Sequence, residues 1–162
     1  MLVVEPFKPD RHNQEGFTCN EPTLDAYLRQ YATQHHRDGI STTHVLLDDA
    51  ESSRILGYYS LSAAQVLLTD FPEAGRNRLT SYPLPAIRMG RLAVAASEQG
   101  KEHGSYLVAH AVARCLSLRE QFGVHMLLAN ARHEKAARFY RAYGFREAMA
   151  NSCTLYLSLE NS

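Results

Sequence analysis

The stretch that decides the fold is Arg91-Leu92-Ala93-Val94-Ala95-Ala96-Ser97-Glu98-Gln99-Gly100-Lys101-Glu102-His103-Gly104. Its first half is apolar and is typical of the end of a strand, and its second half is a polar turn bounded by glycines. Apolar residues at helical spacing follow over residues 103–119, so a helix is expected to begin at the turn. Strand, turn and helix start in this order gather unpaired backbone N–H groups, which bind anions. We therefore expect an anion site at residues 99–104.

Glu102 carries the wrong charge for such a site. A carboxylate about 6 Å from a phosphate charge would weaken binding by roughly 2 to 3 kcal/mol at an effective dielectric constant near 20, or about a hundredfold in affinity. Solvent screening reduces this penalty if the side chain points outward, and Lys101 or His103 can offset part of the rest. A positive φ at this position would add a conformational cost that glycine avoids.

Length and composition predict one globular domain spanning residues 1–162. Lys plus Arg and Asp plus Glu both number 17, so any site for a polyanion must be a local patch. No run is apolar and long enough to span a membrane, and three cysteines without a Cys-x-x-Cys pair favour reduced thiols in the cytoplasm. The eight histidines show no ligand spacing on a helix, so no metal site is expected.

Hydrophobic periodicity predicts the order β, α, β, β, β, α, β, α, β. Asn20 is expected to cap the first helix and Gly144 to end the last. This order predicts an α/β fold with a mixed, mostly antiparallel sheet and helices on both of its faces. The expected strands are 3–8, 42–47, 55–66, 87–94, 124–129 and 154–159; the expected helices are 20–39, 103–119 and 133–143; and a loop is expected over 70–85.

Two motifs make the sequence resemble the GNAT family of N-acetyltransferases. Leu92-Ala93-Val94 followed by Gln99-Gly100-Lys101-Glu102-His103-Gly104 is similar to the family's strand and its Gln/Arg-x-x-Gly-x-Gly/Ala turn, with Glu102 where the family usually has glycine. Asn130-Ala131 followed by Ala136-Ala137-Arg138-Phe139-Tyr140-Arg141-Ala142-Tyr143-Gly144-Phe145 is similar to its last conserved block. The two motifs stand in the right order and at the right spacing, so the resemblance covers nearly the whole chain.

The resemblance implies acetyl-CoA as co-substrate, without a metal. The turn amides would hold the pyrophosphate, the edge of the strand would pair with the pantetheine arm, and an N–H near Val94 would polarise the thioester carbonyl. Asn130 would orient the pantetheine or, alternatively, cap the helix near His133. The implied cofactor-binding residues are Leu92, Ala93, Val94, Gln99, Gly100, Lys101, Glu102, His103, Gly104 and Asn130.

Tyr140 matches the family's proton donor to the leaving thiolate. A phenol with a pKa of about 10 is a plausible acid towards a thiolate whose conjugate acid has a pKa of about 8.5. The alternative is a tyrosine that packs on the core, as aromatic neighbours in the same helix would.

Within the family, the chain looks most like the acetyltransferase toxins of bacterial toxin–antitoxin pairs, which acetylate the α-amino group of aminoacyl-tRNA. This resemblance implies a ribbon-helix-helix antitoxin as partner and a homodimer. It rests on Phe17-Thr18-Cys19-Asn20 with Leu24-Asp25-Ala26-Tyr27-Leu28, on Gly57-Tyr58-Tyr59-Ser60-Leu61-Ser62, and on the run from Tyr82 to Val94. Phosphates of the tRNA would be bound by Arg76, Arg78, Arg88 and Arg91; the alternative for each of them is an ordinary solvated surface position.

Two other functions remain open. One keeps the cofactor but transfers the acetyl group to a protein or a small-molecule amine. The other is a non-catalytic binding module of the same fold, in which Glu102 has weakened the cofactor site.

Overall fold

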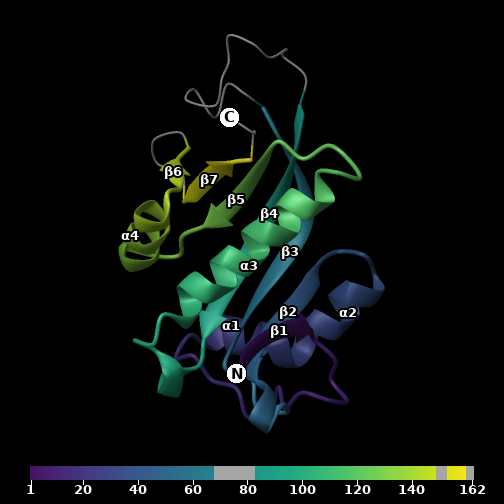
Figure 1. The fold of residues 1–162 in the computed structure, drawn as a ribbon, viewed down its shortest axis with the longest axis vertical. Coiled ribbons are helices and arrows are strands. Elements are labelled where there is room, and N and C mark those ends of the chain that lie inside the picture. The colour runs from purple at the N-terminus through teal and green to yellow at the C-terminus, as the bar shows by residue number, and fades with distance from the viewer. Residues whose placement is uncertain (68–82, 149–152, 160–162) are drawn as a thin grey trace. The chain divides into compact units, whose positions relative to one another are not determined.

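The computed structural model describes residues 1–67, 83–148 and 153–159 (Figure 1). Its strands are hydrogen-bonded in the order β1-β2-β3-β4-β5-β7-β6. Pairing is antiparallel between β1 and β2, β2 and β3, β5 and β7, and β6 and β7, whereas β4 and β5 run parallel. The predicted mixed, mostly antiparallel sheet is therefore confirmed. The strands are β1 (Leu2–Pro6), β2 (Thr42–Asp48), β3 (Gly57–Val66), β4 (Leu84–Val94), β5 (Met126–Asn130), β6 (Arg146–Glu147) and β7 (Thr154–Ser158).

Most predicted boundaries lie within three residues of those observed, with two differences. Leu84 and Pro85, expected in a loop, begin β4, while most of the predicted loop lies outside the described residues. Strand β6 was not predicted, because two exposed residues carry no periodicity. The helices are α1 (Pro22–Ala26), the π-helix η1 (Tyr27–Tyr31), α2 (Ala32–Arg37), the 3₁₀ turns η2 (Asp49–Glu51) and η5 (Ala96–Glu98), α3 (His103–Leu118) and α4 (Glu134–Tyr143).

The start of the first helix differs from the prediction. Asn20 does not cap it, because its backbone adopts a φ of +69° and Glu21 takes the N-cap position instead. The buried carboxylate of Asp25 reaches back and accepts hydrogen bonds from Cys19 N (2.9 Å) and Thr18 Oγ1 (3.1 Å). Asp25 in the first turn thus holds the segment that precedes the helix, and the N-cap residue makes no side-chain capping bond.

The chain forms two compact units, and the first comprises residues 1–62 and 91–111. Alternation along β2 buries both faces of its sheet: Val45 and Leu47 join the core formed with α1 and η1. His44 lies on the opposite face, where its ring and that of Tyr59 contact His110 of α3. Helices thus cover both faces of this sheet, as predicted.

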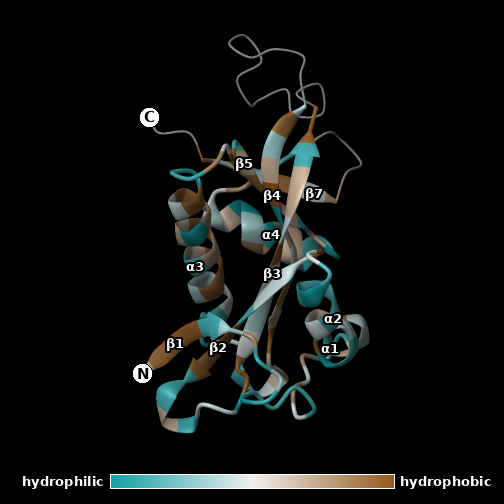
Figure 2. Ribbon diagram, turned by 90° about the vertical axis from the view of Figure 1, so that its right-hand side faces the viewer, coloured by the Kyte–Doolittle hydropathy of each residue, from teal (hydrophilic) through white to brown (hydrophobic). Residues whose placement is uncertain are grey.

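The second unit comprises the described parts of 63–90 and 112–162. Its core holds Met126 and Leu128 of β5, with Tyr156 of β7 opposite Leu128 in the register. Figure 2 shows hydrophobic and hydrophilic residues mixed along its helix α4, and the buried ones, Ala137 and Tyr140, stand three residues apart on one side of it. Over the described ranges, no helix combines the length and the apolar character needed to cross a membrane.

Candidate active site

Strand β4 extends beyond the end of its parallel partner β5. Its register with β5 runs from Ala86 opposite Met126 to Met89 opposite Ala129 and ends there. Residues 90–94 therefore have no strand on that side within the part of the chain that the structure describes. Their backbone groups on that edge are available to an extended ligand, which can pair with them as an added strand.

The turn after β4 lies in the first unit and has an unusual backbone. Gly100 has a φ of +86° and Glu102 a φ of +64°, after which α3 begins at His103. The Glu102 carbonyl accepts the first backbone hydrogen bond of the helix, from Tyr106 N at 3.2 Å. The N–H groups of residues 103–105 thus have no intrahelical acceptor, which makes this helix start suitable for an anion.

Gln99 fastens the turn to the strand. Its Nε2 donates to the carbonyl of Val94 (3.2 Å) and more weakly to that of Cys19 (3.4 Å). The side chain predicted to contact the cofactor is therefore engaged with the protein's own backbone. Gln99 therefore offers a ligand its main-chain N–H group.

Glu102 is exposed, and within the described residues its carboxylate makes no hydrogen bond or ion pair. Solvent screening therefore reduces its repulsion of an anion at the turn. Its φ of +64° is costly for a residue with a side chain and free for glycine. The penalty of Glu102 is thus partly conformational.

Glu98 is buried below the turn and was missed by the sequence analysis. Its carboxylate accepts hydrogen bonds from Arg54 Nη2 (3.0 Å), Lys101 Nζ (3.3 Å) and His103 Nε2 (3.2 Å). Burial alone would raise its pKa, but the three hydrogen bonds outweigh burial and hold the pKa below its usual value. The side chains of Lys101 and His103 are therefore engaged by Glu98 and only indirectly offset the negative charge of Glu102. Among the described residues, no group of three or more His, Cys, Asp or Glu side chains could hold a metal ion.

Gly57 is the second residue that the sequence analysis missed. It opens β3 directly against the end of β4, and a Cβ there would lie 2.8 Å from the carbonyl oxygen of Ala93 and 3.0 Å from Leu107 Cδ1. Real Cβ atoms do not approach backbone oxygens so closely. Only glycine fits beneath the strand that leads to the turn.

Tyr140 belongs to α4 in the second unit. Its ring is buried, and it contacts Phe139 and Phe145 with ring centroids 5.3 Å apart in each case. Burial raises the pKa of its phenol, and no charged group opposes that shift. The hydroxyl therefore stays protonated across the physiological range, as a proton donor must.

Asn130 ends β5 and contacts an arginine of the neighbouring strand. Its Oδ1 accepts a hydrogen bond from Arg88 Nη1 at 2.9 Å, which leaves its NH₂ group as the free donor. The capping alternative for Asn130 is wrong, because His133 caps α4 by accepting from Ala136 N at 3.1 Å. Asn130 is thus held by Arg88 and does not cap the helix; its contact with the cofactor stays a prediction.

The four predicted phosphate-binding arginines have different surroundings. Arg88 is paired with Asn130, whereas the guanidinium of Arg91 lies 3.5 Å from the ring centroid of Tyr27. Within the described ranges, Arg91 has no carboxylate partner, so its charge is available to an anion. Arg76 and Arg78 lie outside the described residues.

Two comparisons of the sequence identify relatives. A family model described as an acetyltransferase (GNAT) domain matches residues 39–147, which reach into both compact units. The tRNA-acetylating toxin of Mycobacterium tuberculosis is 32% identical over 153 residues, which are 94% of this chain and 90% of the toxin.

Solved structures agree with this assignment. AtaT complexed with acetyl-methionyl-tRNAfMet matches with a TM-score of 0.89 and 28% identity, covering 98% of this chain and 95% of AtaT. AtaTR bound with AcCoA matches with a TM-score of 0.81 and 28% identity, covering 97% of this chain and 92% of that one. The family model, the curated relative and the fold all lead to one conclusion: the chain belongs to the GNAT acetyltransferases.

Proposed function

We propose that this protein transfers the acetyl group of acetyl-CoA to the α-amino group of aminoacyl-tRNA, and so acts as a toxin that blocks translation. The observation that carries the proposal is the unpaired end of β4 leading into an anion-binding turn, an arrangement suited to an acyl-CoA. The curated relative is named for tRNA acetylation, and related structures hold acetyl-methionyl-tRNA or AcCoA.

The cofactor would lie along residues of both motifs. The pantetheine arm pairs with the edge of Leu92, Ala93 and Val94, and the pyrophosphate is held by main-chain N–H groups between Gln99 and Gly104. The NH₂ group that Arg88 leaves free on Asn130 suits a pantetheine carbonyl. Of the side chains predicted for this role, those of Gln99, Lys101 and His103 act through the protein by fixing the turn.

The transfer needs few groups from the protein. The neutral α-amine attacks the thioester carbon, and a backbone N–H near Val94 stabilises the oxygen as it gains charge. The carbon–sulfur bond then breaks, the thiolate takes a proton from Tyr140, and the nitrogen releases its extra proton to water, from which the phenolate of Tyr140 is reprotonated. An α-amine with a pKa of about 8 is partly neutral near pH 7, so no dedicated base is needed.

The acceptor is an anionic polymer, and Arg91 is the described arginine best placed to bind one of its phosphates. Its guanidinium contacts the ring of Tyr27, and the hydroxyl of Tyr27 is hydrogen-bonded to Ser41 Oγ (2.5 Å) and His35 Nδ1 (3.0 Å). Arg76, Arg78 and Arg88 are proposed as further phosphate-binding residues on sequence grounds.

The biological setting follows from the relatives. Structures of AtaT with the antitoxin AtaR and of AtaTR support an antitoxin as partner of this protein. We propose an antitoxin with a ribbon-helix-helix DNA-binding half, a homodimeric toxin, and action in the cytoplasm, where aminoacyl-tRNA is used.

Mass spectrometry of a charged tRNA pool incubated with protein and acetyl-CoA tests the function. The expected result is a mass increase of one acetyl group on the aminoacyl moiety of a subset of tRNAs, with deacylated tRNA unchanged. Acetylation of protein or small amines without charged tRNA would favour the other enzymatic function. No calorimetric binding of acetyl-CoA at millimolar concentration would leave only the non-catalytic module.

Replacing Glu102 should tighten cofactor binding. Glu102→Gln removes the charge and keeps the side chain; because the carboxylate is exposed, we expect at most about a tenfold decrease in the Kd of CoA. Glu102→Gly also relieves the φ of +64° and should raise the free energy of unfolding by about 0.5 to 1 kcal/mol. Calorimetry measures the Kd of CoA, and urea denaturation measures the free energy of unfolding. A higher Kd in both variants would contradict the proposed penalty of Glu102.

A further inference from the structure

Glu98 has no role in the chemistry proposed above, yet it is the most heavily bonded carboxylate of the turn. Only 11% of its side chain is exposed. Oε1 accepts from both Lys101 and His103, while Oε2 accepts from Arg54. Since a carboxylate only accepts, Nε2 of His103 carries the proton in this contact. A buried carboxylate with three donors keeps its position, because the loss of these donors would leave its charge uncompensated where water solvates it poorly.

The bonds of Glu98 bracket the strained part of the turn. Its main-chain N–H donates to Ala95 O at 2.8 Å, and its side chain holds the residues on either side of Glu102. The two positive φ angles, at Gly100 and Glu102, both fall between these attachment points. A backbone that would otherwise relax is thereby held in the conformation that starts α3 at His103.

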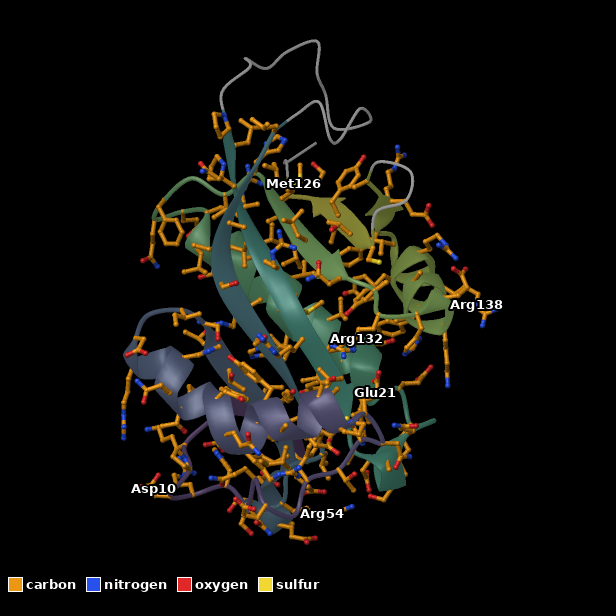
Figure 3. The ribbon with its side chains drawn as sticks, turned by 180° about the vertical axis from the view of Figure 1, so that it is seen from behind. Asp10, Glu21, Arg54, Met126, Arg132 and Arg138 are labelled. Carbon is orange, nitrogen blue, oxygen red and sulfur yellow. The ribbon has the colours of Figure 1, made fainter. Side chains whose placement is uncertain are left out.

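The third partner comes from a distant segment. Arg54 (labelled in Figure 3) belongs to the loop before β3 and stands 44 residues earlier in the sequence than Glu98. Its Nη2 also donates to Ser97 Oγ at 2.9 Å. The same loop is bonded to the end of β4 through Ala95 N and Leu56 O, 2.8 Å apart. The turn is therefore anchored to a neighbouring loop before any ligand arrives.

We propose that Glu98 is a positioning residue for the pyrophosphate of acetyl-CoA: by holding Lys101 and His103 it keeps the N–H groups at the start of α3 directed outward. This inference rests on the proposed function. A turn that is already ordered in the folded protein loses little conformational entropy when the ligand binds. The affinity for the ligand is therefore higher.

If Glu98 acted only through its negative charge, it would weaken the binding of an anion, whereas positioning strengthens that binding. This difference makes the inference testable. A carboxylate near an anion site repels the ligand, so neutralising it should tighten binding if charge were its only influence. Positioning requires instead that neutralisation loosen binding, because a neutral amide in place of the carboxylate would hold a lysine and an imidazole less firmly. A decrease in Kd on neutralisation would therefore indicate charge repulsion, and an increase would indicate positioning.

The experiment compares Glu98→Gln with Glu102→Gln, which removes the same charge from the same turn. Calorimetry gives the Kd of CoA, and steady-state kinetics give KM and kcat with acetyl-CoA and charged tRNA. We expect Glu98→Gln to raise Kd and KM about tenfold, equivalent to about 1.4 kcal/mol, with kcat at saturation unchanged. Glu102→Gln should lower Kd. A folded Glu98→Gln protein that binds CoA as tightly as the wild type, or more tightly, overturns the inference.

Arg54→Gln provides a second measurement if Glu98→Gln does not fold. The Arg54 side chain is 43% exposed, so its loss should be tolerated while one hydrogen bond to Glu98 disappears. We expect a three- to tenfold rise in the Kd of CoA with kcat unchanged; an unaltered Kd in this variant overturns the inference. A wild-type protein that binds no CoA overturns the proposed function as well, so the two failures are distinguishable.

Discussion

Tyr140→Phe should lower kcat about 10²- to 10⁴-fold and leave the KM for acetyl-CoA near that of the wild type, the range expected for loss of a general acid. The ring keeps its contacts with Phe139 and Phe145, because only the hydroxyl is removed. Single-turnover transfer to charged tRNA measures the rate directly. In cells, expression of the wild type should arrest growth and expression of the variant should not.

Tyr143→Phe is the matched control, since Tyr143 lies on the same helix with 37% of its surface exposed. It should keep wild-type kcat, and both variants should unfold at the wild-type midpoint. If Tyr140→Phe retained full activity, Tyr140 would be a packing residue and the thiolate would take its proton from water.

The pH profile gives a further test of the same role. Burial raises the pKa of Tyr140, so its phenol remains protonated below and well above neutral pH. Activity should therefore not fall through loss of the acid up to about pH 10, whereas it should rise through about pH 8 as the acceptor amine becomes neutral. A fall in kcat between about pH 8 and 10 would assign the proton to a different group.

Gly57→Ala should destabilise the fold by about 1 to 3 kcal/mol and weaken acetyl-CoA binding as well. The added Cβ would lie 2.8 Å from the Ala93 carbonyl oxygen, so the end of β4 must move. That movement displaces the edge on which the pantetheine is expected to pair. Thermal denaturation measures the stability, with a loss of about 2 to 4 °C in Tm expected for each kcal/mol in a chain of this size.

Gly123→Ala is the corresponding control, because a Cβ there meets nothing nearer than Pro85 Cγ at 3.7 Å, an ordinary contact. Its stability should match the wild type within about 0.5 kcal/mol. Equal losses at the two glycines would rule out the clash with β4 as their cause, since the effect of Gly→Ala on the unfolded chain favours folding.

The strand, turn and helix around residues 91–104 were predictable because apolar periodicity and glycine placement are local signals. Tyr140 was predicted from its motif; the structure shows that its ring is buried, and its catalytic role stays a prediction. Glu98 was not found: its partners at positions 101 and 103 meet it only because the turn bends back, and Arg54 is far away in the sequence. The sequence offered a weak sign, a carboxylate three residues before a lysine.

Other features depend on tertiary context that no local pattern records. Gly57 looks like any glycine at a strand start until the carbonyl of Ala93 is seen beside it. Asn20 is a good N-cap by residue type, but Asp25 satisfies the backbone there and leaves Asn20 in the left-handed region. The first helix could not be divided from its sequence into α1, η1 and α2, since π turns have no periodic signature.

The unpaired end of β4 makes the stability of the protein depend on a bound ligand. A ligand that pairs with residues 90–94 recognises only the folded chain, and at a hundred times its Kd it adds about 2.7 kcal/mol to the free energy of unfolding. An acyl-CoA bound there would protect the protein from local opening and from proteolysis. The stability of the protein should therefore rise with the concentration of acyl-CoA.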